Sequence, residues 1–206
     1  MNTFSSSRTR LAVLGTISDL HREPLDYDLA CLRSIVTDLA PDFLCAEITR
    51  EAWENGDLSL VSVEVREALA PVEAATDIVI VPVASTLKHY VDFAPSQRWR
   101  RDLVYTFDQL LQWGQRKANR PEAINGLMFG AFCHTVCWLT EKMWAAEDRA
   151  AWQAQNKAMA ENILLAAQRD PGRRVLVAVH CQRLHRLLPL LRTDINWLEI
   201  VNYWEL

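Results

Sequence analysis

Residues 174–185 read RVLVAVHCQRLH, and this stretch decides the fold. Five apolar residues follow Arg174, and the hydrophobic run stops abruptly at His180. A short, continuous apolar run of this kind is typical of a strand that is buried on both faces of a parallel sheet. In open α/β sheets, ligands bind at the carboxyl ends of the strands. We therefore expect His180 to lie at the edge of the sheet where a functional site would form.

Other apolar runs place further strands around this one. They are found at 11–15, 43–46, 77–83 and 197–201, and the last of these is expected at an edge of the sheet. Between the runs, apolar residues recur at intervals of three and four, which is typical of helices. A strand, a helix and a second strand in succession indicate a right-handed crossover and therefore parallel strands. The helical segments expected from this pattern cover about 27–40, 61–74, 98–117, 122–146, 148–168 and 180–192.

The fold class predicted by this order is α/β, with a central, mainly parallel sheet that is flanked by helices. The chain has 206 residues, half of them hydrophobic, which suits a single α/β domain over 1–206. Residues 1–9 are polar and serine-rich, so we expect a flexible arm there. A helical insertion is expected at about 98–146, before the last strands. Its second helix is nearly apolar all round in its middle, which predicts that it is buried.

Composition and charge exclude several classes of partner. The formal net charge is −4 and the basic residues are scattered, so we expect no nucleic-acid binding. No apolar run is long enough to cross a bilayer, and the first ten residues lack the apolar core of a secretory signal, so we expect no membrane association. Five cysteines without disulfide-scaffold spacing indicate reduced thiols and a cytoplasmic protein. A homodimer is compatible with these observations.

Polar side chains gather where the predicted strands end. A carboxylate beside a histidine at such an edge is suited to acid/base chemistry, since the imidazole transfers protons near pH 7. The candidate catalytic residues are Glu47, His180 and His21. Residues expected to bind a small-molecule substrate are Thr16, Asp19, Arg22, Arg50, Arg183 and His185. Structural alternatives are a surface pair of Glu47 with Arg50, a helix cap at His180 and an exposed basic face around His185.

Metal and haem sites were weighed against a site without a cofactor, which is the prediction we prefer. Cys133 and Cys137 lie one helical turn apart in an apolar segment, where free cysteine behaves as a small hydrophobe. Zinc sites usually have closer pairs of thiols with matching partners elsewhere. A divalent metal held by the candidate histidines and Glu47 is the alternative. Haem is another, with Tyr90, His89 or His134 as its axial ligand.

Four segments in order resemble the superfamily that contains the erythromycin esterases, the ChaN-type haem-binding proteins and the TraB/Tiki proteins. Residues 155–163, QNKAMAENI, resemble the R-D/N-x-x-M-A-x-N segment of the esterase-like proteins. Residues 178–183, AVHCQR, correspond to the A-H-N-x-H end of the strand that follows it. Residues 14–16, LGT, are similar to the end of the first strand, and residues 41–47, PDFLCAE, to the P-D-x-h-x-x-E of the second. Residues between about 50 and 145 match no motif.

The resemblance implies an α/β fold with its site at the strand ends, and metal-free hydrolysis as in the esterases. By position, Glu47 matches the glutamate of the second strand and His180 the first histidine of the A-H-N-x-H form. The second histidine of that form is replaced by Arg183. The glutamate and histidine of the first-strand motif fall on Thr16 and Asp19. These replacements imply a chemistry that differs from that of the family's named members.

The function expected from these observations is acid/base catalysis without a metal, most simply hydrolysis. The substrate would be a small anionic or carbonyl-containing molecule, with Arg183 binding a carboxylate or an oxyanion. A biosynthetic enzyme of the same fold is a variant of this hypothesis. The alternatives are a ChaN-like protein that binds haem or another small ligand, and a catalytically silent homologue.

Overall fold

A computed structural model describes residues 8–86, 90, 93, 95–192 and 196–206. Five strands of this structure form one sheet in the order β3-β2-β4-β1-β5, and all of its strand pairs are parallel. The strands are β1 (Thr9–Thr16), β2 (Phe43–Thr49), β3 (Val79–Ala84), β4 (Arg174–His180) and β5 (Leu198–Val201). This confirms the predicted α/β class and places the last strand at an edge, beside β1.

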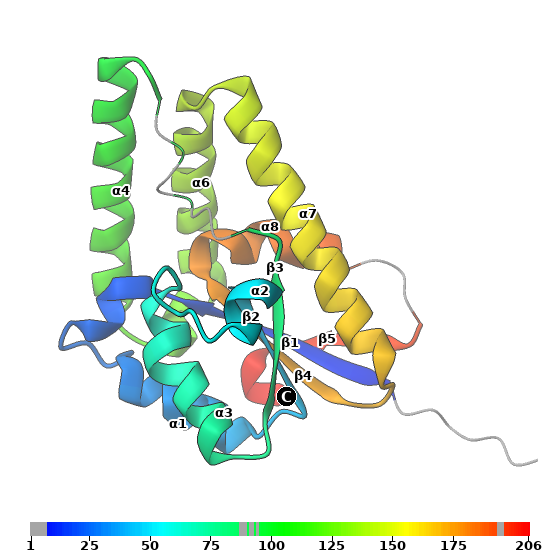
Figure 1. Cartoon of the computed structure of the whole chain (residues 1–206). Helices are drawn as coiled ribbons and strands as arrows, with labels where there is room; N and C mark the ends of the chain where they lie inside the picture. The colour runs from blue at the N-terminus through cyan, green and yellow to red at the C-terminus, as the bar shows by residue number, and fades with distance from the viewer. Residues whose placement is uncertain (1–7, 87–89, 91–92, 94, 193–195) are drawn as a thin grey trace, which may run out of the picture.

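Helices fill the connections between the strands. They are η1 (Ser18–Arg22), α1 (Leu29–Leu39), α2 (Arg50–Glu54), η2 (Val65–Leu69), α3 (Ala70–Ala75), α4 (Arg98–Ala118), α5 (Pro121–Ile124), α6 (Leu127–Met143), α7 (Ala146–Arg169), α8 (Cys181–Leu191) and η4 (Tyr203–Glu205). In Figure 1, α4 and α6 stand side by side and extend away from the sheet, while α7 slopes back towards it. Among the described residues, no helix has both the length and the apolar character needed to cross a membrane.

Alternating side chains of the strands pack into two separate cores, one on each face of the sheet. On one face, Leu14 and Leu44 pack with residues of α1, η2 and α3. On the other, Val13 and Val177 pack with residues of α7 and α8. Successive residues of a strand point to opposite faces, so an unbroken apolar strand requires helices on both sides. The five apolar residues of 175–179 are each at most 3% exposed, as the sequence predicted.

The connections leave the sheet on opposite faces, and this creates the crevice for a site. After β1 and β2 the chain packs on the face covered by α1, η2 and α3. After β4 it packs on the face covered by α7 and α8. β4 lies between β1 and β2 in the sheet. In each of the pairs β1–β4 and β2–β4, the segments that follow the two strands therefore pack on opposite faces of the sheet. A parallel sheet opens at its carboxyl edge where connections diverge in this way.

Three sequence predictions are corrected by the structure. The arm expected at 1–9 falls largely outside the described residues, but Thr9 is buried and begins β1. The single helix expected at 122–146 is divided at Asn125 and Gly126 into α5 and α6. It is also not buried throughout, since Leu127 and Met128 are 94% and 91% exposed. The break arises because Asn125 turns its side chain back to β1, where its Oδ1 accepts the Gly15 N–H at 2.6 Å.

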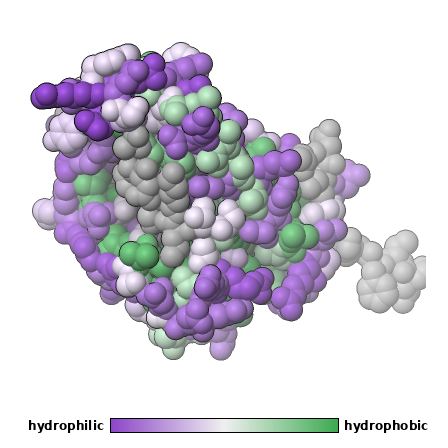
Figure 2. Space-filling view, turned by 45° about the horizontal axis from the view of Figure 1, so that its top comes forward, coloured by the Kyte–Doolittle hydropathy of each residue, from purple (hydrophilic) through white to green (hydrophobic). Residues whose placement is uncertain are grey.

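The molecular face in Figure 2 is mostly hydrophilic. Hydrophobic residues form small separate patches on this face and do not merge into a continuous apolar surface. Isolated apolar side chains of this kind are normal on proteins that fold in water.

Candidate functional site

A cavity of about 610 Å³ lies at the carboxyl edge of the sheet. Residues 17–20 after β1, Glu47 in β2 and His180 at the end of β4 contribute to its walls. Residues 59–64, together with side chains from α4 and α7, enclose the remaining sides. Its volume falls in the range of small-molecule sites, about 300–1,000 Å³. Two of the predicted catalytic residues, Glu47 and His180, therefore share one cavity.

Glu47 forms a buried ion pair with Arg183, which is 2% exposed. The Nε of Arg183 donates to Oε1 of Glu47, and its Nη1 donates to Oδ1 of Asn156 at 3.2 Å. Its Nη2 donates to Oε1 of Gln155 at 3.5 Å, and the guanidinium lies 4.1 Å from the ring centroid of Trp152. The three nitrogens of Arg183 are thus all engaged within the protein. In this structure Arg183 neutralises Glu47, a role that the sequence did not predict, and its expected role in substrate binding stays a prediction.

Residues 155 and 156 also belong to the QNKAMAENI segment that carries the family resemblance. The Nδ2 of Asn156 donates to the Trp152 carbonyl at 2.7 Å, so its Oδ1 faces the guanidinium. Farther along α7, the Nδ2 of Asn162 donates to the Val83 carbonyl of β3 at 3.0 Å. The segment therefore fastens α7 to the sheet and supports the ion pair in the cavity wall.

The second oxygen of Glu47 connects the ion pair to His180. Oε2 accepts the backbone N–H of His180 at 3.2 Å. The His180 side chain caps α8, with Nδ1 accepting the N–H of Gln182 at 3.4 Å. In a neutral imidazole this acceptor role places the proton on Nε2. Burial opposes ionisation of Glu47, but the charge and hydrogen bond of Arg183 and the His180 N–H outweigh it, so the pKa of Glu47 is lowered.

Glu64 is a second buried carboxyl in the same cavity, and the sequence analysis did not identify it. It is 4% exposed, and its Oε1 accepts the Thr16 hydroxyl at 2.7 Å. Its Oε2 is buried and has no hydrogen-bond partner among the described residues. Burial raises the pKa of Glu64, and the negative charge of Glu47 adds to that rise. The signal in the sequence was a single charge among the alternating valines of residues 61–65, VSVEV, which the weak helical pattern obscured.

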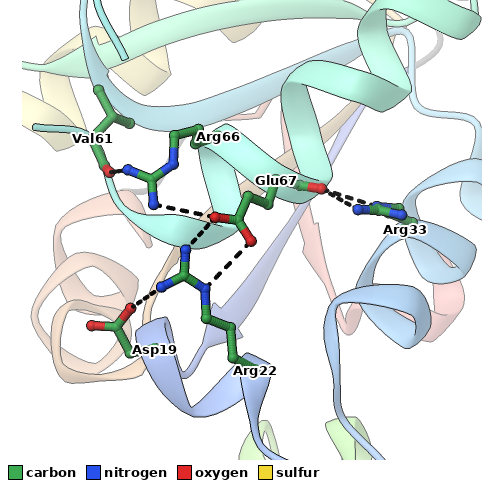
Figure 3. Close-up of polar contacts among 6 residues, drawn as sticks. All are labelled: Asp19, Arg22, Arg33, Val61, Arg66 and Glu67. Carbon is green, nitrogen blue, oxygen red and sulfur yellow. Dashed lines mark hydrogen bonds and ion pairs between the residues drawn. The ribbon is translucent and has the colours of Figure 1, made fainter. Parts of the chain in front are cut away.

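A π-helical turn, η2, follows Glu64 directly and sets its position. Such turns are uncommon and occur often at functional sites. Pro71 has no N–H to donate to the carbonyl of Glu67, four residues earlier. Arg33 of α1 donates to that carbonyl instead, with its Nε at 3.0 Å (Figure 3). The altered helix is therefore anchored to α1 on the side away from the cavity.

A charged network at the rim holds the same turn from the other side. Figure 3 shows Arg22 between Asp19 and the carboxylate of Glu67, which Arg66 also contacts. Arg66 further donates to the Val61 carbonyl at 3.5 Å. The sequence prediction made Arg22 a substrate-binding residue, but its guanidinium is occupied here. Its contacts instead join η1 to the segment that carries Glu64.

His21 lies beneath the rim as a structural residue. It is 1% exposed, its Nε2 accepts the Ile17 N–H at 3.1 Å, and its Nδ1 donates to the Tyr27 carbonyl at 2.8 Å. Both ring nitrogens are therefore used in shaping the loop after β1. Burial lowers the pKa of His21 from 6.5 to about 4, so the ring is neutral at pH 7. We leave His21 out of the catalytic group for these reasons.

Acid is expected to destabilise the protein through His21. Since its pKa is lower in the folded than in the unfolded chain, unfolding binds a proton between pH 6.5 and about 4. The free energy of unfolding should therefore be unaffected above pH 7 and fall by about 3 kcal/mol across that window. Denaturant unfolding of wild type and His21→Gln at pH 7.5, 6, 5 and 4 measures this.

His185 adds a second contribution of the same sign, because burial lowers its pKa to about 4 as well. The His21→Gln protein should therefore lose about half of the histidine contribution to the pH dependence, and the double variant with His185→Gln should lose the rest. A pH dependence that is the same in His21→Gln and wild type would contradict the structural role of His21.

The remaining predicted substrate-binding residues lie in different places, and only Asp19 is among the residues that line the cavity. Thr16 is fully buried and donates to Glu64, and Asp19 lies at the rim. Arg50 is exposed and pairs with Glu54 at 3.8 Å in α2, outside the residues that line the cavity. His185 lies in α8 with its ring centroid 6.1 Å from that of His134, also outside the lining. The structure thus does not bring Arg50 or His185 to the site.

The residues considered as metal or haem ligands include the cysteines, Tyr90 and His89. All five cysteines are free thiols, and the Sγ atoms of Cys133 and Cys137 lie 3.9 Å apart. In the described part of the chain, no three His, Cys, Asp or Glu side chains are grouped to hold a metal ion. Tyr90 donates its hydroxyl to the Cys137 carbonyl at 3.1 Å and packs between Trp144 and Trp152. His89 lies outside the described residues.

Comparisons with known proteins do not identify a family for this chain. No protein-family model, no curated protein and no solved structure matches the chain.

Proposed function

We propose that this chain is an acid/base enzyme that works without a metal, most simply a hydrolase of a small carbonyl-containing molecule. One observation carries the proposal: two buried carboxyls of the same cavity have pKa values displaced in opposite directions. The pKa of Glu47 is lowered and that of Glu64 is raised. Active sites assign acid and base roles by separating carboxyl groups in this way. Glu64 also lines the cavity, and its buried Oε2 has no hydrogen-bond partner among the described residues, which a purely structural carboxyl would not require.

Glu64 is the proposed proton-transfer group. Its raised pKa makes it a stronger base than an exposed carboxylate and brings it closer to the working pH. It takes a proton from a water molecule whose oxygen attacks the carbonyl carbon. The same proton then passes from Glu64 to the leaving oxygen or nitrogen as the bond to carbon breaks. The products are a carboxylic acid and an alcohol or amine, so no other reactant is needed.

Glu47, Arg183 and His180 form the proposed positioning group. The Glu47 carboxylate holds the His180 backbone at the end of β4, and Arg183 compensates its charge. The His180 side chain, which lines the cavity and accepts the Gln182 N–H, is the proposed donor to the substrate carbonyl oxygen. Charge that develops on that oxygen during attack is stabilised by a donor that is already oriented. The ion pair therefore contributes by fixing the donor, while the proton transfer is made by Glu64.

The charges that line the cavity favour a neutral or cationic substrate over the anionic one that the sequence suggested. Carboxyl side chains outnumber guanidinium groups among the lining residues: Asp19, Glu23, Glu47, Glu64 and Asp108 against Arg66, Arg116 and Arg183. Two of the guanidinium groups are paired with cavity carboxylates, Arg183 with Glu47 and Arg116 with Glu23. The third, Arg66, contacts the Glu67 carboxylate. An added anion would therefore meet guanidinium groups that are already paired, and the cavity carboxylates would repel it.

A panel of chromogenic esters and anilides with neutral, cationic and anionic acyl groups tests the proposed function. We expect turnover that survives incubation with a chelator and is lowest for the anionic acyl groups. Wild type and Glu64→Gln, prepared in parallel, give the comparison. Turnover that disappears with the chelator, or that is equal in the two proteins, would contradict the proposal.

A further inference from the structure

A second pocket, of about 220 Å³, adjoins the cavity between α4 and α6. The two share four lining residues, Tyr90, Asp108, Leu111 and Gln182, so they lie directly beside each other. In Figure 1 these two helices stand side by side beyond the carboxyl edge of the sheet. The pocket therefore lies next to the proposed reaction site, in the helical part that precedes β4.

The walls of this pocket are mainly apolar, and two of the hydroxyl groups that line it have partners within the protein. Val104, Phe107 and Val136 contribute hydrocarbon surface. The Thr140 hydroxyl donates to the Val136 carbonyl at 2.9 Å, and the Tyr90 hydroxyl donates to the Cys137 carbonyl. A ligand in the pocket is thus offered few hydrogen bonds, and the hydrophobic effect is the main force available to bind it.

Asp108 lies where the pocket meets the cavity. Its carboxylate accepts the Gln112 side-chain N–H at 2.8 Å, and burial raises its pKa. The proposed proton-transfer residue Glu64 lines the adjoining cavity, and Asp108 lines both spaces. A molecule that spans the junction would therefore place a polar end in the cavity and an apolar end between the helices.

We infer that this pocket is the subsite for an apolar arm of the substrate, a single substituted aromatic ring or a short branched alkyl chain. This inference rests on the proposed function for its reacting end, the carbonyl group near Glu64. An apolar cavity of about 150 Å³ accommodates benzene, so the observed volume suits one ring with a small substituent. The substrate class is thus an uncharged ester or amide whose acyl group ends in a compact apolar group.

Binding of two neutral amides, phenylbutanamide and butanamide, tests the subsite without any need for turnover. Isothermal calorimetry should show that wild type binds phenylbutanamide about 10- to 100-fold more tightly, since burying a ring of this size favours binding to about that extent. The variant Val104→Trp places a large side chain in the pocket. It should reduce the preference to about twofold or less.

Leu103→Trp is the matched control, because Leu103 neighbours Val104 on α4 but is 37% exposed and lies outside the pocket lining. It should keep the wild-type preference. Val104→Phe fills less of the pocket and should give an intermediate preference, which keeps the test valid should Val104→Trp fold poorly. Equal binding of the two amides by wild type, or equal preferences in Val104→Trp and Leu103→Trp, would overturn the inference.

Measurements on the same proteins distinguish the subsite inference from the proposed function. Selective binding that Val104→Trp removes, in a protein that turns over no ester of the panel, supports the subsite and rejects the hydrolase proposal. Turnover that depends on Glu64, with no preference for the phenyl group in any variant, supports the hydrolase proposal and rejects the subsite.

Discussion

Replacing Glu64 by Gln is expected to lower kcat by about 10²- to 10⁴-fold, the usual contribution of a general acid or base. The amide has nearly the shape of the carboxyl and can still accept the Thr16 hydroxyl, but it cannot take up a proton. KM should change little, because the loss falls on the proton-transfer step. Steady-state kinetics on the best ester of the panel, with an unfolding curve for each protein, measures the effect.

Stability gives an independent readout of the same substitution. Because the pKa of Glu64 is raised in the folded protein, folding binds a proton above pH 4.5, and wild type loses stability as pH rises through the folded pKa. The Gln variant lacks this loss, so near pH 8 it should be at least as stable as wild type. A variant that is both inactive and strongly destabilised would point to a structural defect and contradict the assigned role.

Thr16→Val is the matched control for Glu64. It removes the hydroxyl that donates to Oε1 at 2.7 Å and keeps the shape of the side chain. Loss of a donor to the ionised form raises a carboxyl pKa further. The acid limb of the pH–rate profile should therefore move to higher pH while the maximal rate is largely kept. An unchanged profile would mean that the limb reports another group.

The largest stability effect is expected at the ion pair of Glu47 and Arg183. Arg183→Met should lower the free energy of unfolding by about 3–5 kcal/mol, because it leaves the Glu47 carboxylate buried without its cation. The variant also leaves the side-chain oxygens of Asn156 and Gln155 without their donor. Denaturant unfolding at pH 7 measures the change.

The double variant Glu47→Leu with Arg183→Met separates charge from packing. Removing both charges of a buried pair is often nearly neutral, so the double variant should recover most of the stability that Arg183→Met loses. Lys157→Met on α7 is the surface control, since Lys157 pairs with Glu161 at 3.9 Å in an exposed position. Its effect should be much smaller. A double variant as unstable as the single one would contradict the electrostatic explanation.

The sequence by itself determined the α/β class and the main elements. The run at 174–179, the shorter runs at 11–15 and 43–46, and the helical spacing between them depend on neighbouring residues along the chain. Side-chain periodicity is a local property, and it indicates whether one face or both faces of an element are buried. The expectation that Glu47 and His180 meet at the carboxyl edge also followed from this pattern, because parallel strands end at the same edge.

Tertiary structure alone decided how the site residues are used. β4 lies between β1 and β2, which brings Arg183 to Glu47 across 136 residues of sequence. That pairing gives Arg183 the role of neutralising Glu47, which the sequence did not predict. Burial of His21 against the Ile17 N–H and the Tyr27 carbonyl similarly replaces a catalytic role by a structural one.

Glu64 is the clearest case of a residue that only the folded chain could identify. Its segment carries a weak helical pattern, and nothing local predicts a π-helical turn held by Arg33 of α1. The pKa values of Glu47 and Glu64 diverge because Glu47 meets the guanidinium of Arg183, while Glu64 is buried without a cationic partner among the described residues and lies near the charge of Glu47. Those surroundings come from segments far apart in the chain, so they exist only once the sheet, η2 and α7 have packed together.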